Sequence, residues 1–300
     1  MKKYLVTGAS GFLGKIIVDE LMQKDALNKV FRLSRKGVVD YKTDLTTKFS
    51  PFDQKFDIVI HCAGKAHSIP KTENEKDRFY AVNVTGTDNL LKAITPKLPE
   101  AFVFISSVAV YGKETGHMLS EEQPLDGYSP YAKSKIQAEE LVMSWGKEHK
   151  VPILILRLPL IAAPTPPGNL GKMIKAIKKN RYFSVGGGRA KRSVVLGSDV
   201  AEFISQNIGA SGIYNLTDGY HPSFREIENL ICNQLEKKRL PSIPNWMAIA
   251  LGKVGDLIPG SPVNSDMINK MTSDLTFSSN KASEKLKWQP SKVINHFKIE

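Results

Sequence analysis

The chain has 300 residues, of which 41% are hydrophobic and 24% are charged, proportions typical of a globular protein. This composition excludes a disordered, collagen-like or wholly coiled-coil chain, and the length suggests two domains. Lysine and arginine outnumber aspartate and glutamate by 42 to 30, which gives a net charge of +12 and favours an anionic partner such as a phosphorylated molecule, nucleic acid or a membrane surface.

The cysteines and the apolar segments bear on the compartment. Cys62 and Cys232 are the only cysteines, too few for a disulfide framework or a four-ligand zinc site, so we expect a reducing, cytoplasmic location and no metal. The segment Trp246–Ile258 is the most apolar later stretch, but a membrane span needs about 20 residues. We therefore expect a core or interfacial helix there, in preference to a membrane contact, and no membrane span.

The first half of the chain alternates short apolar runs with helical patterns. The expected strands are Tyr4–Thr7, Val30–Leu33, Asp57–His61, Ala101–Ser107 and Ile153–Arg157. The expected helices between them are Lys15–Gln23, Val84–Ile94 and Ser134–Trp145. This alternation predicts an α/β fold, a doubly wound parallel sheet with helices on both faces.

The composition changes around Pro159. A turn cluster, APTPPG, is followed by a basic helical pattern over Leu170–Asn180 and by a late strand-like run over Gly212–Leu216. We expect a doubly wound domain over 1–160, to which about 192–217 return, and a smaller, mostly helical substrate-binding lobe over 161–191 and 218–300.

Three glycines directly follow the first expected strand and open the next helix. Gly8, Gly11 and Gly14 have the spacing G-x-x-G-x-x-G. Glycine permits a tight turn and lets the backbone approach a pyrophosphate, which the N–H groups of a helix N-terminus bind. Such glycines also occur in ordinary turns, but their place between a strand and a helix indicates dinucleotide binding.

A tyrosine and a lysine, Tyr131 and Lys135, lie four residues apart on one face of an expected helix. A neighbouring cation stabilises a phenolate and lowers the pKa of tyrosine from about 10, so that it can transfer a proton near neutral pH. Ser106 and Ser107 end the preceding expected strand, at the edge where a doubly wound sheet binds its ligands. Taken alone, the tyrosine and lysine could also be a pair on a helix surface, and the two serines could simply form a turn.

Together these elements resemble the extended short-chain dehydrogenase/reductase family, in particular its nucleotide-sugar epimerases, dehydratases and reductases. The segment TGASGFLG, which includes Phe12 and Leu13, is similar to the family's T-G-x-x-G-F-[IL]-G opening. Similar segments follow in order along nearly the whole chain: HCAG, VNVTGTDNLL, SSVAVYG, YAKSK, RSVVLGSDVA, NLTDG and NKASEKLKWQP. The resemblance implies the Rossmann form of the doubly wound sheet.

The resemblance also implies roles for the matching residues. Ser107 would hydrogen-bond the substrate oxygen, Tyr131 would transfer the proton, and Lys135 would hold the nicotinamide ribose and lower the pKa of Tyr131. A hydride would pass between the nicotinamide and a sugar carbon. Further cofactor contacts would be made by Asp44, Leu45, Ala63, Gly64 and Asn83.

The end of the second expected strand bears on the choice of cofactor. NAD-dependent enzymes of this fold usually carry an acid there to bind the ribose hydroxyls, whereas this sequence has Arg32, Ser34 and Arg35. A guanidinium suits a ribose 2′-phosphate. We therefore expect NADP(H) to be favoured over NAD(H), the alternative being that these are solvated loop charges.

The substrate side rests on the resemblance alone. Arg192 would contact the diphosphate of a nucleotide sugar, and Asn169 would meet its base. His67, in HCAGKAH, resembles a histidine of reductases that act on 4-keto-6-deoxy-N-acetylhexosamine nucleotides. The stretch RLPLIAAPTPPG departs from those reductases at Leu158 and at 162–163, which leaves the sugar open.

The predicted function is NAD(P)-dependent 4-keto reduction of a nucleotide-linked sugar, for example a UDP-4-keto-6-deoxy-N-acetylhexosamine. The alternative is a UDP-hexose 4-epimerase that retains its NAD. A non-catalytic dinucleotide sensor is disfavoured because the serine, tyrosine and lysine are all present, and a nucleic-acid binder because the basic residues are scattered without a binding motif. The resemblance also allows a homodimer through a four-helix bundle of the helices Val84–Ile94 and Ser134–Trp145.

Overall fold

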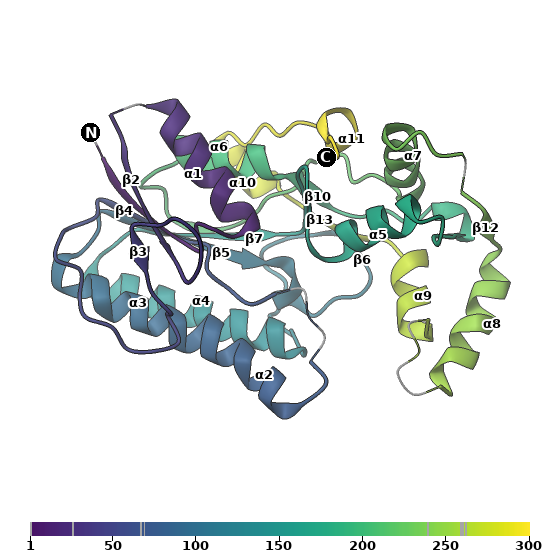
Figure 1. Ribbon diagram of the computed structural model, residues 1–300, viewed down its shortest axis with the longest axis horizontal. Helices are drawn as coiled ribbons and strands as arrows, with labels where there is room; N and C mark the ends of the chain where they lie inside the picture. The colour runs from purple at the N-terminus through teal and green to yellow at the C-terminus, as the bar shows by residue number, and fades with distance from the viewer. Residues whose placement is uncertain are drawn as a thin grey trace.

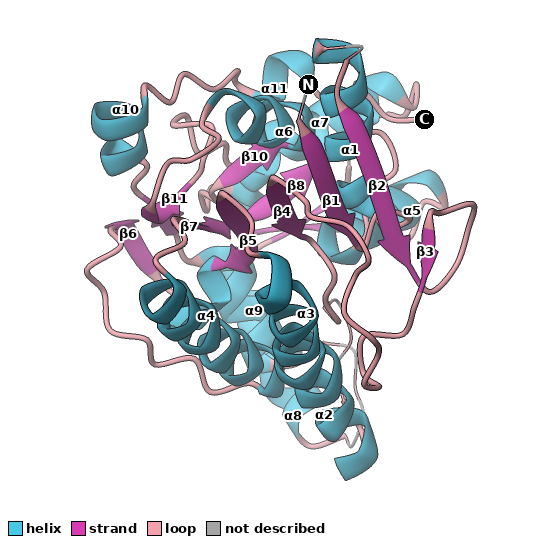
Figure 2. Cartoon of the chain, turned by 90° about the vertical axis from the view of Figure 1, so that its left-hand side faces the viewer, coloured by secondary structure: helices cyan, strands magenta, loops and turns pink. Residues whose placement is uncertain are grey.

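The computed structural model describes residues 2–25, 27–66, 68, 70–238, 240–258, 261 and 263–300. Its centre is a seven-stranded sheet in the order β11-β7-β5-β4-β1-β2-β3, and every pairing is parallel (Figures 1 and 2). The strands are β1 Lys3–Thr7, β2 Lys29–Ser34, β3 Tyr41–Lys42, β4 Ile58–His61, β5 Ala101–Ser107, β7 Ile153–Leu158 and β11 Gly212–Asn215. The predicted doubly wound α/β fold is confirmed.

Helices cover both faces of this sheet, as Figure 2 shows. On one face lie α1 Phe12–Lys24, α6 Gly197–Gln206 and α10 Asn280–Leu286, and on the other lie α3 Gly86–Ile94 and α4 Pro130–His149. Within β1, Tyr4 and Val6 point into the first of these cores and Leu5 into the second. Because both faces are buried, the strands read as nearly continuous apolar runs rather than as alternating ones.

The helix expected over Val84–Ile94 is longer than its apolar pattern indicates. It begins as α2, Glu73–Tyr80, where the Thr72 side chain accepts a hydrogen bond from the backbone of Glu75. It then passes through a π-helical turn, η1 Ala81–Thr85, into α3. Helix α2 is almost entirely polar, with Phe79 as its buried residue, so a search for apolar patterns does not predict it.

The segment 192–217, which we expect to return to the sheet domain, contributes one strand to the main sheet. Strand β10, Val194–Leu196, pairs with β8, Leu160–Ala162, outside the main sheet. Helix α6 then packs on α1, and β11 pairs with β7 at the sheet edge. The domain boundaries themselves stay a prediction.

Most of the remaining elements lie toward the right-hand end of Figure 1 and form the second lobe. Its helices are α5 Gly168–Lys178, α7 Phe224–Gln234, α8 Asn245–Asp256, α9 Ser265–Thr272 and α11 Val293–His296. Two further parallel pairs are β9 Ser184–Val185 with β12 Ser242–Ile243, and β6 Gly116–Leu119 with β13 Leu275–Phe277. Of these elements, β6, β13 and α11 lie nearer the middle of Figure 1.

The apolar segment Trp246–Ile258 forms most of α8 and the turn that follows it. Most of the large side chains of this segment are exposed. The expectation of a core helix is therefore wrong, and the interfacial alternative is left. Within the described ranges, no helix is both long enough and apolar enough to cross a membrane.

Candidate active site

The glycine loop between β1 and α1 has a shape that only glycine fits. Gly8 has a φ of +66°, and a Cβ there would lie 2.7 Å from the backbone nitrogen of Ala63. A Cβ at Gly14 would lie 2.2 Å from the carbonyl oxygen of Gly8. Helix α1 begins after Gly11 without a side-chain cap, so its first N–H groups have no side-chain acceptor. This cradle fits the pyrophosphate of a dinucleotide.

The loop that follows β4 is held by Asn83. The Asn83 Oδ1 accepts from the backbone of Lys65 at 2.7 Å, and its Nδ2 donates to the Lys65 carbonyl at 3.1 Å and to Ser134 Oγ at 2.9 Å. This buried amide thereby ties the loop carrying Ala63 and Gly64 to α4. Of the predicted cofactor residues, Asn83 therefore works in this structure by shaping the loop.

His61, at the end of β4, links three elements beneath the glycine loop. Its Nδ1 lies 2.6 Å from Thr7 Oγ1 and its Nε2 lies 2.9 Å from Thr87 Oγ1. Burial, and to a smaller degree the charge of Lys135, lower the pKa of His61 to about 3. The imidazole is thus a neutral connector of β1, β4 and α3.

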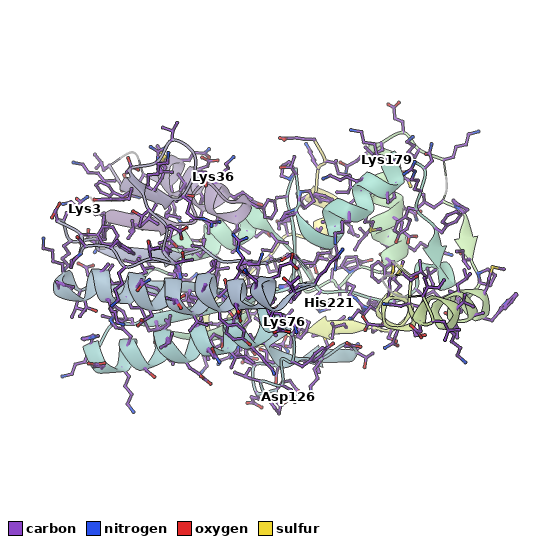
Figure 3. The ribbon with its side chains drawn as sticks, turned by 60° about the horizontal axis from the view of Figure 1, so that its bottom comes forward. Lys3, Lys36, Lys76, Asp126, Lys179 and His221 are labelled. Atoms are coloured by element: carbon purple, nitrogen blue, oxygen red, sulfur yellow. The ribbon has the colours of Figure 1, made fainter. Side chains whose placement is uncertain are left out.

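At the end of β2, the predicted 2′-phosphate residues differ in how they are engaged. Arg32 Nε donates to Asp40 Oδ2 at 3.1 Å, so this guanidinium is already paired. Ser34 Oγ lies 2.5 Å from Ser10 Oγ in the glycine loop, which joins the two cofactor segments. Lys36, labelled in Figure 3, is exposed nearby on the same domain.

Arg35 extends from the same turn toward the predicted adenine side. Its Nη1 lies 3.9 Å from Asp44 Oδ2, a contact between two exposed side chains. Hydrogen bonds from Thr46 hold the pKa of Asp44 below its usual value. The carbonyl of Leu45 accepts from Asn89 Nδ2 at 2.8 Å, which fixes this segment on α3.

Ser107 and Tyr131 meet where β5 ends and α4 begins. The Ser107 Oγ accepts from the backbone of Ala109 at 3.2 Å, and Ser129 caps α4 just before Tyr131. Burial raises the pKa of Tyr131, while a hydrogen bond with Ser107 acts to lower it. The predicted catalytic hydroxyls are therefore brought together. The expected lowering of the Tyr131 pKa by Lys135 is not found, because burial is the larger cause and raises this pKa.

Lys135 lies one helical turn further along α4. Its Nζ donates to the carbonyl of Ile105 at 2.6 Å and sits 3.8 Å from the centre of the Phe104 ring. Burial lowers its pKa to about 7, although the charge of Glu139 acts to raise it. Burial thus makes this ammonium easier to deprotonate than that of an exposed lysine.

Behind Lys135 lies a buried ion pair that the sequence analysis missed. Arg157 in β7 donates through Nη2 to Glu139 Oε2 at 2.7 Å, and Ser106 also donates to Glu139. Arg157 Nη1 reaches Tyr111 Oη at 3.1 Å. The signal was an arginine inside an apolar strand and a glutamate four residues after Lys135.

The predicted substrate residues are not gathered in the same way. The guanidinium of Arg192 donates to the carbonyls of Lys270 and Ser273 at the end of α9, and to the carbonyl of its chain neighbour Lys191. It also lies over the ring of Phe224. Asn169 is exposed on the first turn of α5.

The last two predictions concern His67 and metal binding. His67 lies outside the described residues. Within the described part of the chain, no group of three or more His, Cys, Asp or Glu side chains could hold a metal ion.

The fold and the glycine loop define the class: a Rossmann-type α/β protein with a second lobe over the carboxyl ends of its strands (Figure 1). The model of the NAD dependent epimerase/dehydratase family matches residues 4–216, and the chain belongs to this family. The resemblance stated from the motifs is thereby confirmed, and the family acts on nucleotide sugars with NAD(P).

Individual relatives are distant but nearly full-length. A UDP-glucose 4-epimerase of Vibrio cholerae is 26% identical, covering 98% of this chain and 92% of the relative. An N-acetyl-alpha-D-glucosaminyl-diphospho-ditrans,octacis-undecaprenol 4-epimerase of Escherichia coli O157:H7 is 28% identical, covering 84% and 77%. The solved structure of RMD from Pseudomonas aeruginosa complexed with NADPH has a TM-score of 0.74 at 22% identity, covering 99% and 96%. That structure supports the fold alone.

Proposed function

We propose that the protein reduces a keto group at C4 of a nucleotide-linked sugar, with NADP(H) as the favoured cofactor. The observation that carries this proposal is that Ser107 and Tyr131 meet at the carboxyl end of β5, where Lys135 also donates to the β5 backbone. An intact proton-transfer group beside a dinucleotide cradle supports a redox enzyme rather than a sensor.

The three side chains divide the work of one proton transfer. The Tyr131 hydroxyl donates its proton to the sugar oxygen, and Ser107 donates a hydrogen bond to the same oxygen. The charge of Lys135 stabilises the phenolate left on Tyr131. When bound, the cofactor supplies the hydride for the sugar carbon.

The cofactor preference rests on the turn after β2. Arg35 is exposed and only loosely paired, and Ser34 faces the glycine loop, so both suit a ribose 2′-phosphate. Arg35→Ala should weaken NADPH binding by about 1 to 3 kcal/mol, the range for a charge-assisted hydrogen bond, and leave NADH binding almost unchanged. Lys29→Ala, an exposed charge at the other end of β2, is the control. A wild-type preference for NADH in fluorescence titration would contradict this assignment.

Arg192 is proposed as the diphosphate ligand. Its hydrogen bonds to the carbonyls of Lys270 and Ser273 also allow a second, structural role, in which it stabilises the end of α9. The two roles predict different results. Arg192→Met should raise the KM for the nucleotide sugar at least about tenfold if the guanidinium binds phosphate in a partly dry cleft. Arg189→Met is the matched control. A loss of stability with an unchanged KM would mean that Arg192 has the structural role only and does not bind the diphosphate.

The second candidate is 4-epimerisation with retained NAD, favoured by the similarity to the UDP-glucose 4-epimerase of Vibrio cholerae. An epimerase oxidises and re-reduces the same carbon, so it keeps its cofactor, whereas a reductase exchanges it. The deciding experiment is to assay the purified protein with UDP-hexoses and with 4-keto sugar nucleotides, following the nicotinamide absorbance. Net NADPH oxidation with a 4-keto substrate supports reduction, and tightly bound NAD with no net oxidation supports epimerisation.

The carrier of the sugar has a second candidate as well. The name of the Escherichia coli relative describes a sugar that is linked through a diphosphate to undecaprenol. A lipid-linked sugar diphosphate is favoured here by one observation, the exposed apolar side chains of α8.

A further inference from the structure

Helix α8 is attached to the protein through its smallest residues. Ala248, Gly252 and Gly255 are its buried positions, and they recur at helical spacing. A Cβ at Gly255 would lie 1.7 Å from the carbonyl oxygen of Val263, and one at Gly252 would lie 3.2 Å from Ser265. This close seam against the segment leading into α9 sets the rotation of α8 about its own axis.

That rotation directs the large apolar side chains of α8 into solvent. Trp246 is 70% exposed, Val254 57% and Leu257 82%, and all three lie on the side away from the seam. Met247, Ile249 and Leu251 are exposed as well. Soluble proteins rarely leave so many neighbouring apolar side chains uncovered, and such a patch marks a contact surface.

The lobe that carries α8 also carries most of the protein's net positive charge. Residues 161–191, 218–279 and 287–300, which leave out α10, contain 16 lysines and arginines against 8 aspartates and glutamates, whereas the remaining residues contain 26 against 22. Over 159–191 there are seven basic residues and no acidic one. Figure 3 shows one of them, Lys179, on the lobe. An apolar helix on a basic lobe is complementary to an anionic lipid surface.

The same charge argues against a second copy of the chain on this face. A two-fold contact through α8 would place two lobes with a net positive charge beside each other, which is unfavourable. Phosphate headgroups would instead attract both lobes. On α8 itself, Lys253 follows Trp246 by seven residues, so its stem can lie along the apolar side while its ammonium reaches the headgroups.

We propose that α8 docks the protein on an anionic membrane surface, with Trp246, Val254 and Leu257 inserted at the level of the headgroups. The helix lies in the plane of the interface and does not span the bilayer. This docking concerns the outer surface of the lobe and stands whichever sugar and carrier the active site accepts.

The first test is flotation of the full chain with vesicles of phosphatidylglycerol and phosphatidylcholine in equal parts. Wild-type protein should float with these vesicles and not with phosphatidylcholine alone, and added salt should weaken the binding. Trp246→Gln with Leu257→Gln should reduce the partition coefficient at least about tenfold. The control is Met22→Gln with Leu27→Gln, two exposed apolar positions on the other domain.

The second test uses the tryptophans. Of the three, Trp145 and Trp288 are buried and Trp246 is exposed, so lipid-dependent changes in emission report on α8. Brominated phosphatidylglycerol should quench the wild-type emission, and Trp246→Phe should remove most of that quenching while the protein still floats.

Three results would overturn the proposal. They are failure of the wild type to bind anionic vesicles, binding that the α8 double variant leaves intact, and a wild-type dimer that the same variant splits into monomers in light scattering. Nucleotide-sugar turnover is measured separately, so a failed activity assay leaves the docking result readable.

Discussion

Helices α4 and α8 place their polar and apolar sides in opposite ways. Along α4, Ala138, Val142 and Trp145 are buried in the sheet core, while Lys133 and Glu140 face solvent. Along α8 the buried positions are small and the exposed ones are large and apolar. The chemistry of α4 therefore lies on its inner side, against β5, whereas the function of α8 lies on its outer side.

This contrast also bears on assembly. The helices expected to form a four-helix bundle between subunits are α3 and α4. Their exposed positions include the polar Lys92, Lys133, Gln137, Glu140 and Ser144, and Met143 is an apolar exception. A dimer through these helices stays a prediction from the resemblance. The run of exposed large apolar side chains around α8 lies on the lobe instead.

The largest expected effect tests the inner side of α4. Tyr131→Phe removes the hydroxyl that transfers the proton, so turnover should fall by about 10² to 10⁴. Cofactor affinity should stay nearly the same, because the glycine loop is untouched. Steady-state kinetics and a dinucleotide titration measure the two quantities. Retention of more than about a tenth of the rate would remove Tyr131 from its role.

The next effect tests what anchors that inner side. Arg157→Met leaves Glu139 buried without its partner, which should lower the free energy of unfolding by about 3 to 5 kcal/mol. The double variant Arg157→Met with Glu139→Leu removes both charges and should recover most of that loss. Urea unfolding of the three proteins measures the difference. Equal losses in the single and double variants would mean that packing, not charge, holds α4 to β7.

A third prediction concerns the pH dependence that Lys135 produces. Its pKa is about 7 in the folded protein against 10.5 for an unperturbed lysine, so between these values the unfolded chain binds the extra proton. The free energy of unfolding should therefore rise with pH across this window. Lys135→Met should flatten that rise, and the exposed neighbour Lys133→Met should not. Identical slopes for both variants in urea unfolding would contradict the low pKa of Lys135.

The smallest expected effects test the seam and the outer side of α8. Gly255→Ala forces a Cβ against the Val263 carbonyl and should cost about 1 to 3 kcal/mol of stability. Trp246→Gln, on the exposed side, should change the free energy of unfolding by no more than about 0.5 kcal/mol. Both are measured by denaturant unfolding. A large loss from Trp246→Gln would mean that this side chain packs inside the protein.

The elements that carry the chemistry were predictable because their signals are local. The expected strand Ala101–Ser107 matches β5 in full, since an apolar run ending in two serines needs no distant partner to be recognised. The glycine spacing predicted the turn into α1, and the four-residue spacing placed Tyr131 and Lys135 on one helix face. In each case the backbone geometry follows from neighbouring residues.

Other features depended on contacts that are distant in the sequence. No pattern near Arg192 predicts that its guanidinium binds carbonyls around residues 270 to 273. Likewise, Glu139 and Arg157 lie on different elements, and only the packing of α4 on β7 joins them. Side-chain partners of this kind are chosen by the tertiary arrangement.

By itself, the sequence determined the α/β class, the dinucleotide loop and the serine, tyrosine and lysine of the candidate site, because spacing along one strand or helix sets which side chains share a face. The tertiary structure decided which face of each element is covered. For Trp246–Ile258 the apolar composition indicated burial, yet the fit of Gly252 and Gly255 against the chain before α9 turned the large side chains outward. Composition measures how apolar a helix is, but only its neighbours determine which of its sides meets water.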